Sequence, residues 1–192
     1  MEYYQRFIEI APTERFRNGN VILRYITEID IEDYIRWMTI ENEWRDWDAP
    51  WEEDNSAEFI ERQRAAVKVS PSAYGKLEIY TLTGRHIGWV SAYNIDGDKN
   101  RRAVGIDVVP VEYRGKGYGE SALTLFMAYL FETENTLYTQ TWSGNAAMIR
   151  LAAKIGFIEF ERITDLHIVR GKKYDALTFS ISRDDFFTRY SV

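Results

Sequence analysis

A run of alternating glycines between Val108 and Glu120 constrains the fold of this chain more than any other feature. Glycines stand at positions 115, 117 and 119, directly after the apolar residues 104–109 and before an apolar helical stretch. Glycine tolerates left-handed backbone and leaves neighbouring N–H groups unshielded, so the run predicts a strand, a turn and a helix N-terminus. Such an N-terminus holds phosphate through its N–H groups and the helix dipole. The run therefore predicts a ligand that carries phosphate groups.

Two common nucleotide-binding motifs do not fit this run. A dinucleotide fingerprint requires a third glycine at position 120, where Glu120 stands. A Walker loop requires Gly-Lys followed by Ser or Thr, and Lys116 is followed by Gly117. The ligand is therefore expected to be neither a dinucleotide in a Rossmann fold nor a nucleotide in a P-loop.

The order of the predicted elements indicates one α+β domain that spans residues 1–192. With 45% hydrophobic residues the chain has enough apolar material for one core. After a tail of about 18 residues, strands are predicted at 21–25, 77–82, 86–93, 104–109, 137–141, 157–163 and 176–181. Helices are predicted at 30–38, 56–69, from the glycine turn to 131, and at 146–155, with a short helix at the end. Asp30 and Ser56 are predicted as N-caps.

This order predicts a mixed, mainly antiparallel sheet of about seven strands, split near its middle, with about four helices on its faces. The strands up to Val109 follow one another through short turns and form a meander. After the glycine turn, helices cross over between strands, so part of the sheet is expected to be parallel.

Several classes of site are disfavoured by composition. The chain has no cysteine, which excludes disulfides, thiolate metal sites and a cysteine nucleophile. Its two histidines, His86 and His167, do not stand at a metal-ligand spacing, so no metal is expected. A net charge of −6 works against nucleic-acid binding. No run of 18 apolar residues occurs, and we expect a cytoplasmic protein without a membrane partner.

Two segments together resemble one known family. Arg114-x-x-Gly117-x-Gly119 after a strand is similar to the pyrophosphate-binding motif of the GCN5-related N-acetyltransferases, the GNAT family. The segment from Asn145 to Phe157 is similar to the family's next segment, an Asn-led helix that ends in Gly-Phe and a strand. The resemblance covers residues 75–182 well, and the preceding part fits more loosely. The long glycine run is similar to the ribosomal-protein alanine N-acetyltransferase branch, the RimJ and RimL type.

The resemblance implies acetyl-CoA as co-substrate and a set of residues that contact it. The family's bulged fourth strand splays from the fifth, and Val108 and Val109 are the matching positions, which would pair with the pantetheine arm through their backbone. The N–H groups of residues 114–119 would hold the pyrophosphate, so the implied residues are Arg114, Gly115, Lys116, Gly117, Tyr118 and Gly119. Side-chain contacts from Arg114 and Lys116 are one alternative, and solvated loop positions are the other. Asn145 would reach the cofactor arm, cap its helix, or do both.

Asp107 is the candidate catalytic residue, because a carboxylate inside an apolar strand requires a partner and an incoming ammonium is one. The resemblance implies that it faces the acceptor amine, and the alternative is an outward-facing strand residue. The family's usual general acid is a tyrosine four residues before Gly156, where this chain has Ala152. The acid is therefore unassigned, with Ser143, Tyr138 or solvent as candidates.

Residues 41–58 combine three tryptophans with eight carboxylates and one arginine. One hypothesis is that the segment attracts a cationic acceptor by charge and by cation–π contacts, with Glu52, Glu53 and Asp54 contributing to steering. The alternative is that the tryptophans pack in the core or at a dimer contact while the acids are solvated. The sequence leaves both open.

The function implied by the resemblance is direct transfer of an acetyl group from acetyl-CoA to a primary amine. The acceptor stays open among a protein N-terminus, a polyamine, an aminoglycoside and another small amine. The rival hypothesis is a non-catalytic acyl-CoA sensor or interaction module of the same fold, supported by Ala152. A homodimer is also left open.

Overall fold

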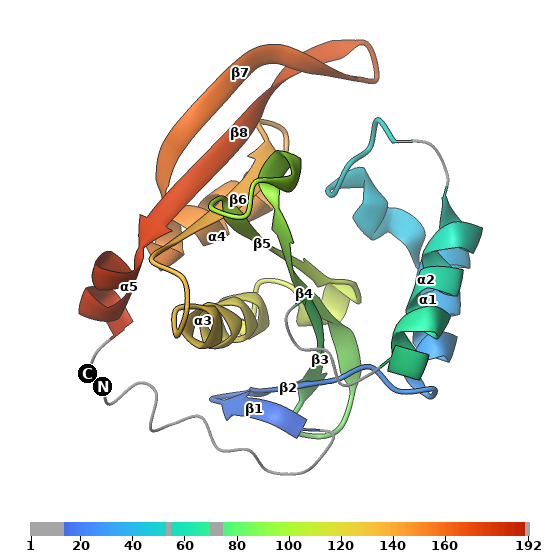
Figure 1. The fold of residues 1–192 in the computed structure, drawn as a ribbon. Helices are drawn as coiled ribbons and strands as arrows, with labels where there is room; N and C mark the ends of the chain where they lie inside the picture. Colours follow the sequence, from blue (N-terminus) through green and yellow to red (C-terminus); the bar gives the residue numbers. More distant parts are fainter. Residues whose placement is uncertain (1–13, 53–54, 70–74, 191–192) are drawn as a thin grey trace.

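The computed structural model describes residues 14–52, 55–69 and 75–190, in which eight strands and five α-helices follow one another (Figure 1). The strands are β1 (Glu14–Asn18), β2 (Val21–Arg24), β3 (Lys76–Thr81), β4 (His86–Asn94), β5 (Arg102–Val108), β6 (Thr136–Trp142), β7 (Ile158–Val169) and β8 (Lys172–Ser182). The α-helices are α1 (Asp30–Thr39), α2 (Ser56–Val69), α3 (Tyr118–Leu130), α4 (Ala146–Ile155) and α5 (Arg183–Tyr190). Short 3-10 helices stand at Asn42–Asp46 (η2), Ile95–Gly97 (η3) and Val111–Tyr113 (η4).

All strands form one sheet in the order β1-β2-β3-β4-β5-β6-β8-β7. Neighbouring strands of the described chain are antiparallel except β5 and β6, which are parallel and joined through the single pair Ala103↔Tyr138. The mixed α+β sheet that splits near its middle is therefore confirmed. The sheet has one strand more than expected because β1 lies inside the stretch predicted as a tail. The short terminal helix is α5.

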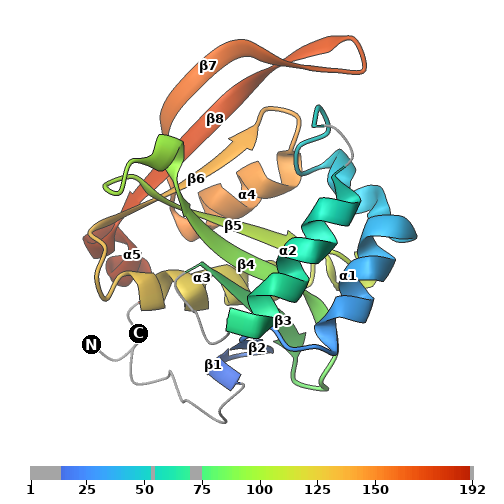
Figure 2. The same cartoon turned by 45° about the vertical axis from the view of Figure 1, so that its right-hand side comes forward.

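The two faces of the sheet carry different layers (Figures 1 and 2). Val90, Val104 and Leu137 pack with α3 and α4 into the larger buried core. On the opposite face, Trp89 of β4 lies 5.3 Å from the ring of Tyr34 in α1. The helices α1 and α2 thus cover one face of β3, β4 and β5, while α3 and α4 cover the other. Any group that projects from β5 faces one of these two layers.

The strand β5 contains no register shift against β4, so the bulge implied by the resemblance is not found between these strands. Their pairing runs without interruption from Gly88↔Val108 to Asn94↔Arg102. The unusual backbone lies instead on β4, where Gly88 has a φ of 150°. A Cβ at Gly88 would lie 1.8 Å from the backbone oxygen of Asp107, so only glycine permits this close approach.

Asp30 is not the N-cap of α1, contrary to the prediction. Ile29 occupies the cap position, and Asp30 is the first helical residue and fully buried. Its carboxylate lies 2.8 Å from Nη2 of Arg24 in β2 and accepts a hydrogen bond of 2.7 Å from the N–H of Thr27. A buried guanidinium requires a paired anion, and that requirement outweighs capping at this position.

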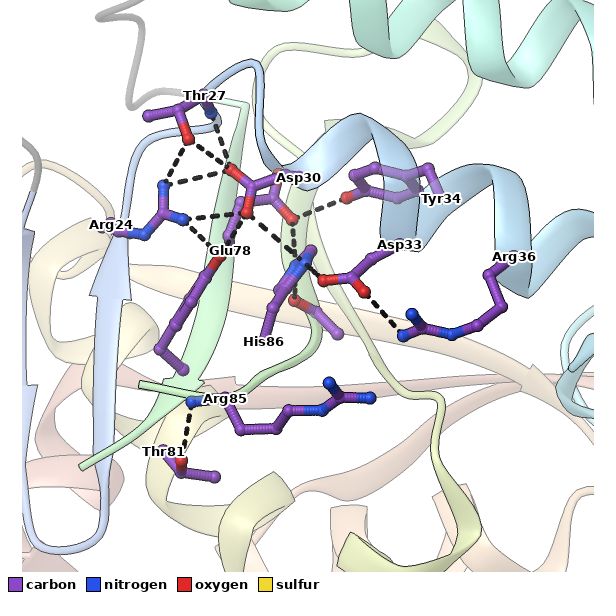
Figure 3. Close-up of polar contacts among 12 residues, drawn as sticks. Arg24, Thr27, Asp30, Asp33, Tyr34, Arg36, Glu78, Thr81, Arg85 and His86 are labelled. Atoms are coloured by element: carbon purple, nitrogen blue, oxygen red, sulfur yellow. Dashed lines mark hydrogen bonds and ion pairs between the residues drawn. The ribbon is translucent and has the colours of Figure 1, made fainter. Parts of the chain in front are cut away.

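The Arg24–Asp30 pair belongs to a buried polar network that joins β2, α1, β3 and β4 (Figure 3). His86 Nδ1 lies 3.0 Å from Asp33 Oδ2, and its Nε2 lies 3.1 Å from Glu78 Oε2. The hydroxyl of Tyr34 donates to the same Glu78 oxygen at 2.6 Å. Burial alone would lower the pKa of His86, but its hydrogen bonds to Asp33 and Glu78 raise the pKa above the ordinary 6.5.

The His86 network predicts a pH dependence of stability. Because the folded-state pKa of His86 is raised, its protonated form stabilises the fold below pH 6.5, and this contribution is lost as the pH rises through the folded pKa. We expect the free energy of unfolding, measured by urea titration, to fall as the pH rises above about 6.5. His86→Gln should lower stability overall and remove this slope, because glutamine does not titrate.

His167 supplies the matched control, because it is the chain's only other histidine. Partial burial lowers the pKa of His167, so its protonation does not stabilise the folded state. The slope should survive in His167→Gln. A slope that persists in His86→Gln would assign the pH dependence to other groups.

Candidate active site

A cavity of about 740 Å³ lies where the sheet splits between β5 and β6. One end is lined by the glycine loop before α3 and by the first turns of α4. The other end is lined by β4, β5 and the segment that follows η2. The cavity therefore joins the two sides of the sheet, and it collects most of the residues that the sequence singled out.

The glycine loop forms an open helix N-terminus, as predicted. Gly117 caps α3 with a φ of 87°, and Gly115 has a φ of 69°. A Cβ at either position would have no atom within 4 Å, so the space beside the loop is free. Gly119 packs instead against Ile106 and Leu151, each 3.8 Å from the position of a Cβ. The first N–H groups of a helix have no partner within it, so this end is suited to bind an anion.

Of the residues predicted to contact the cofactor, Val108, Arg114, Gly115, Gly117, Gly119 and Asn145 line the cavity. Three others do not. Val109 is buried and donates its N–H to the carbonyl of Ile87 in β4 at 2.9 Å, so this group is already paired. Lys116 points to solvent, and Tyr118 packs its ring edge-on against Tyr113. A cofactor contact by the side chain of Lys116, and by the backbone N–H groups of Lys116 and Tyr118, stays a prediction.

The guanidinium of Arg114 is engaged by protein groups. It donates to the carbonyl of Val108 at 2.9 Å and to the carbonyl of Val109, and it pairs with Glu43 at 3.1 Å. These bonds fix the end of β5 against the glycine loop. The sequence left open whether this side chain binds phosphate or is solvated, and the structure shows a third, structural use.

Asn145 caps α4 and also holds the acidic segment. Its side-chain oxygen accepts from the N–H of Met148 at 3.0 Å, and its amide donates to the carbonyl of Trp47 at 2.7 Å. The indole N–H of Trp142 donates to the same carbonyl at 2.9 Å. The capping alternative is therefore confirmed, and a cofactor contact by Asn145 stays a prediction.

Asp107 projects from β5 into the cavity on the side covered by α1 and α2. It stands opposite Trp89 in the β4–β5 register, so both side chains share that face. No hydrogen bond or ion pair reaches its carboxylate within residues 14–52, 55–69 and 75–190. Burial, reinforced by the charge of Asp48, raises the pKa of Asp107 well above its ordinary value, although Lys76 and Arg114 act in the opposite sense. An enclosed carboxylate of this kind is suited to accept a proton or to bind a cation.

The three tryptophans of the acidic segment lie in different surroundings, and the predicted attraction of a cationic acceptor stays a prediction. Trp44 is buried against Trp89, and its indole N–H donates to the carbonyl of Trp37 at 3.0 Å, as expected of a core residue. Trp47 is 47% exposed and lines the cavity together with Asp48. Trp51 stacks on His167 of β7 at 3.6 Å. Glu53 and Asp54, which were assigned to steering, lie outside the described residues.

Comparison with known proteins agrees with this geometry. Residues 20–158 match the model of the acetyltransferase (GNAT) domain. The chain belongs to the GNAT family. It is 25% identical over 103 residues to the SPbeta prophage-derived uncharacterized N-acetyltransferase YokL of Bacillus subtilis (strain 168), a match that covers 52% of this chain and 57% of that protein. The match thus spans little more than half the length of this curated relative.

Solved GNAT structures have the same fold. The ribosomal-protein-S5-alanine acetyltransferase from Vibrio fischeri superposes with a TM-score of 0.69 at 19% identity, over 89% of this chain and 97% of that one. The microcin C7 self-immunity acetyltransferase MccE, solved with acetyl-CoA and AMP, superposes with a TM-score of 0.71 at 16% identity, over 90% and 97% of the two chains. At such identities the likeness establishes the fold, which is that of a GNAT domain.

Sequence reasoning missed several polar residues of this GNAT cavity, and three of them carry groups that titrate. Arg150 and Lys154 of α4 line it, and their spacing of four residues in a predicted helix was the available signal. Tyr93 of β4 also lines it, with a hydroxyl 3.3 Å from Oε1 of Gln140. Burial, reinforced by the charge of Asp48, raises the pKa of Tyr93 to about 12. Tyr93 follows Trp89 by four residues in the same strand, so strand alternation could have predicted that both side chains lie on the same face of the sheet.

The candidates for a general acid do not line the cavity. The hydroxyl of Ser143 accepts from the N–H of Asp175 at 2.9 Å, and Tyr138 packs against Phe160 at 5.3 Å. Ala152, at the position of the family's tyrosine, is fully buried in the core. The cavity's own phenols are Tyr93 and Tyr113.

Two further kinds of site were searched for in the described part of the chain. No group of three or more His, Cys, Asp or Glu side chains there is arranged to hold a metal ion. No described helix is long and apolar enough to span a membrane.

The glycine loop predicts a loss of ligand binding when its free space is filled. Gly117→Val should abolish binding of acetyl-CoA, measured by calorimetry, because the side chain occupies the space in front of the helix N-terminus. The positive φ adds strain of about 1–3 kcal/mol, which a folded domain tolerates.

Gly84→Val is the matched control for this variant. Gly84, in the turn between β3 and β4, has a φ of 81° and also no atom within 4 Å of a Cβ. It should show the same strain in thermal melts and bind acetyl-CoA like the wild type. Equal losses of binding in both variants would mean that the loop has been misassigned.

Proposed function

We propose that this GNAT protein is an N-acetyltransferase that moves an acetyl group from acetyl-CoA to a primary amine by direct attack. The observation that carries the proposal is the cavity through the split sheet. It connects an open helix N-terminus on one side with an unpaired carboxylate, Asp107, on the other. A phosphate-bearing carrier and a cationic acceptor can therefore reach the same space from opposite sides.

The residues present fit the cofactor. The N–H groups around Gly115 and Gly117 are suited to the pyrophosphate, and Arg150 adds positive charge beside it, while Lys154 is paired with Glu120 at 2.6 Å. Because Val109 directs its N–H to β4, the backbone groups of Ile106 and the N–H of Val108 point toward the open side of β5, while the carbonyl of Val108 accepts from Arg114. Beyond Val104, whose carbonyl accepts from Thr139 of β6 at 2.8 Å, β5 has no described partner in β6 and can bind the pantetheine amides as a further strand would. When bound, acetyl-CoA supplies an activated acetyl thioester.

The chain's own groups hold and deprotonate the amine. Asp107 binds the incoming ammonium and takes a proton from it, which leaves a neutral amine to attack the thioester carbonyl. The N–H of Val108 stabilises the negative charge that develops on the carbonyl oxygen. The new bond is carbon–nitrogen and the broken bond is carbon–sulfur: coenzyme A leaves as the thiolate and gains, through solvent, the proton that the nitrogen loses as the amide forms. The absence of cysteine agrees with direct attack without an acyl-enzyme. The amine is carried by a small cationic molecule or a protein N-terminus.

The second candidate function is a non-catalytic acyl-CoA sensor or interaction module. It is favoured by Ala152, which supplies no acid where the family has tyrosine. Release of coenzyme A during incubation with a panel of amines and peptides separates the two functions. Acetyl-CoA binding without release of coenzyme A by any acceptor would favour the sensor.

Acetyl-CoA should raise the melting temperature of the protein, because a ligand that binds only the folded state stabilises it by mass action. At a free concentration 100 times the dissociation constant the gain is about 2.7 kcal/mol. For a chain of this size that corresponds to a shift of roughly 5–10 °C in a thermal melt. An unchanged melting temperature at saturating acetyl-CoA would contradict both candidate functions.

Asp107→Asn should lower kcat/KM for an amine by about a hundredfold or more, since the variant loses the proton acceptor. The dissociation constant of acetyl-CoA should stay within about twofold, because the lost charge acts on the acceptor. Asp98→Asn, which removes the same charge in the turn before β5, is the control and should keep wild-type turnover. Wild-type kinetics in Asp107→Asn would assign Asp107 a structural role.

A further inference from the structure

A second carboxylate without a partner faces the same half of the cavity as Asp107. Asp48 lines the cavity and is open to solvent within it. In the ranges 14–52, 55–69 and 75–190, no hydrogen bond or ion pair reaches its side chain. The proposed function assigns a role to Asp107 and none to Asp48.

The backbone around Asp48 is held in place from two sides. The carbonyl of the preceding residue, Trp47, accepts hydrogen bonds from Trp142 of β6 and from Asn145. The N–H of Asp48 donates to the carbonyl of Trp44 at 3.3 Å. The side chain is therefore presented to the cavity by a fixed loop.

The charge of Asp48 acts on the groups around it. Asp48, Asp107 and Tyr93 line the same cavity, and the charge of Asp48 raises the pKa of the other two groups. Its own pKa is raised, first by burial and then by Glu52, while Arg45 acts in the opposite sense. Two carboxylates thus share a confined space in which their charges repel.

The neighbouring cations are committed to other groups. Lys76 donates to Oε1 of Gln63 at 2.7 Å and lies over the ring of Tyr34 at 4.3 Å. Arg114 is bonded to two backbone carbonyls of the β5 end and to Glu43. Arg45 donates to Ser56 at 3.1 Å. These cations act on the two carboxylates at a distance, but within the described residues none of them forms an ion pair with Asp48 or Asp107, so both carboxylates stay open to a cationic ligand.

Aromatic side chains form the walls between the two carboxylates. They come from η2 and its continuation, from α2 and from β4, and they are Trp44, Trp47, Phe59, Trp89 and Tyr93. Aromatic faces next to carboxylates attract organic cations by cation–π contact and charge. They also suit the methylene chain that connects two charged groups.

We propose that Asp48 is a specificity-determining residue that selects small acceptors with a second positive charge. The reacting amine lies at Asp107, and the second cationic group of the acceptor lies at Asp48 between the aromatic walls. This inference rests on the proposed function, since it assigns the acceptor of the same site. An acceptor with one amine and a neutral far end leaves Asp48 unpaired and should be used less well.

The test compares two acceptors of equal length, 1,5-diaminopentane and 5-amino-1-pentanol, with saturating acetyl-CoA. In the wild type we expect kcat/KM for the diamine to exceed that for the amino alcohol by about tenfold or more, as for a charged hydrogen bond. In Asp48→Asn the ratio should fall to within about threefold of one, with the amino alcohol nearly unaffected. A ratio that is unchanged in Asp48→Asn would overturn the proposal.

Asp46→Asn is the matched control, two residues away on the same segment. Asp46 pairs with Arg170 of the β7–β8 turn at 2.8 Å and lines a separate cavity of about 350 Å³. Its replacement removes the same charge, so it should keep the wild-type preference for the diamine. Equal losses in both variants would point to general charge steering and would overturn a specific role for Asp48.

Calorimetry separates this inference from the proposed function. The protein saturated with coenzyme A should bind 1,5-diaminopentane, and Asp48→Asn should weaken that binding about tenfold or more. Binding that depends on Asp48 without any release of coenzyme A would refute the transferase and retain the dication site. Turnover of amines with diamine binding that does not depend on Asp48 would refute the site and retain the transferase.

Discussion

The split between β5 and β6 is the constraint on which the rest of the structure depends. These two parallel strands are joined at one pair, Ala103↔Tyr138, and by a hydrogen bond from Thr139 to the carbonyl of Val104, so among the described residues the backbone of β5 beyond Val104 has no partner in β6. Exposed strand edges are costly unless they are covered or bind a ligand. Here the edge opens into a cavity with the N-terminus of α3 on one side and Asp107 on the other. A closed sheet would separate these two features, and neither alone could bring an anionic carrier to a cationic acceptor.

The α1–α2 layer must be held firmly against β3 and β4, because it forms the wall on the side of Asp107. Buried charges hold it there. Arg24, Asp30 and His86 connect β2, α1 and β4. Each of these side chains forms an ion pair or a hydrogen bond with another member of the network. Such networks add little net stability compared with apolar packing, but they penalise every arrangement that leaves one member unpaired. The network therefore fixes the position of the layer more than it strengthens the fold.

The sequence predicted the parts of this chain that depend on local chemistry. Alternating glycines, an Asn-led helix and short turns identified α3, α4 and the β3–β4 hairpin close to their observed bounds. The predictions that were wrong or missing concern residues whose roles are set by tertiary contacts. Asp30 looks like an N-cap until Arg24 is known to lie beside it, and Arg114 looks available for phosphate until the end of β5 is placed. Asp48 is one of eight acids in its segment, and only the fold shows that, of those the structure describes, it is the one that lines the cavity.

The two halves of the cavity are mechanically linked through the segment that carries Asp48. Asn145 connects the first turn of α4 to the carbonyl of Trp47, and Glu43 connects the same segment to Arg114 at the glycine loop. Exposed hydrogen bonds and ion pairs of this kind each contribute only about 1 kcal/mol or less, so they are readily exchanged for bonds to a ligand. The carbonyl of Trp47 accepts two hydrogen bonds, one from Asn145 and one from Trp142. A ligand that accepts a hydrogen bond from the side-chain amide of Asn145 would remove the first and leave the second. Since linkage is reciprocal, a change in affinity at one half must be matched by an equal change at the other. The segment that carries Asp48 is thus held by contacts from both α4 and the glycine loop, so the position of the acceptor wall depends on the same residues that line the cofactor half of the cavity.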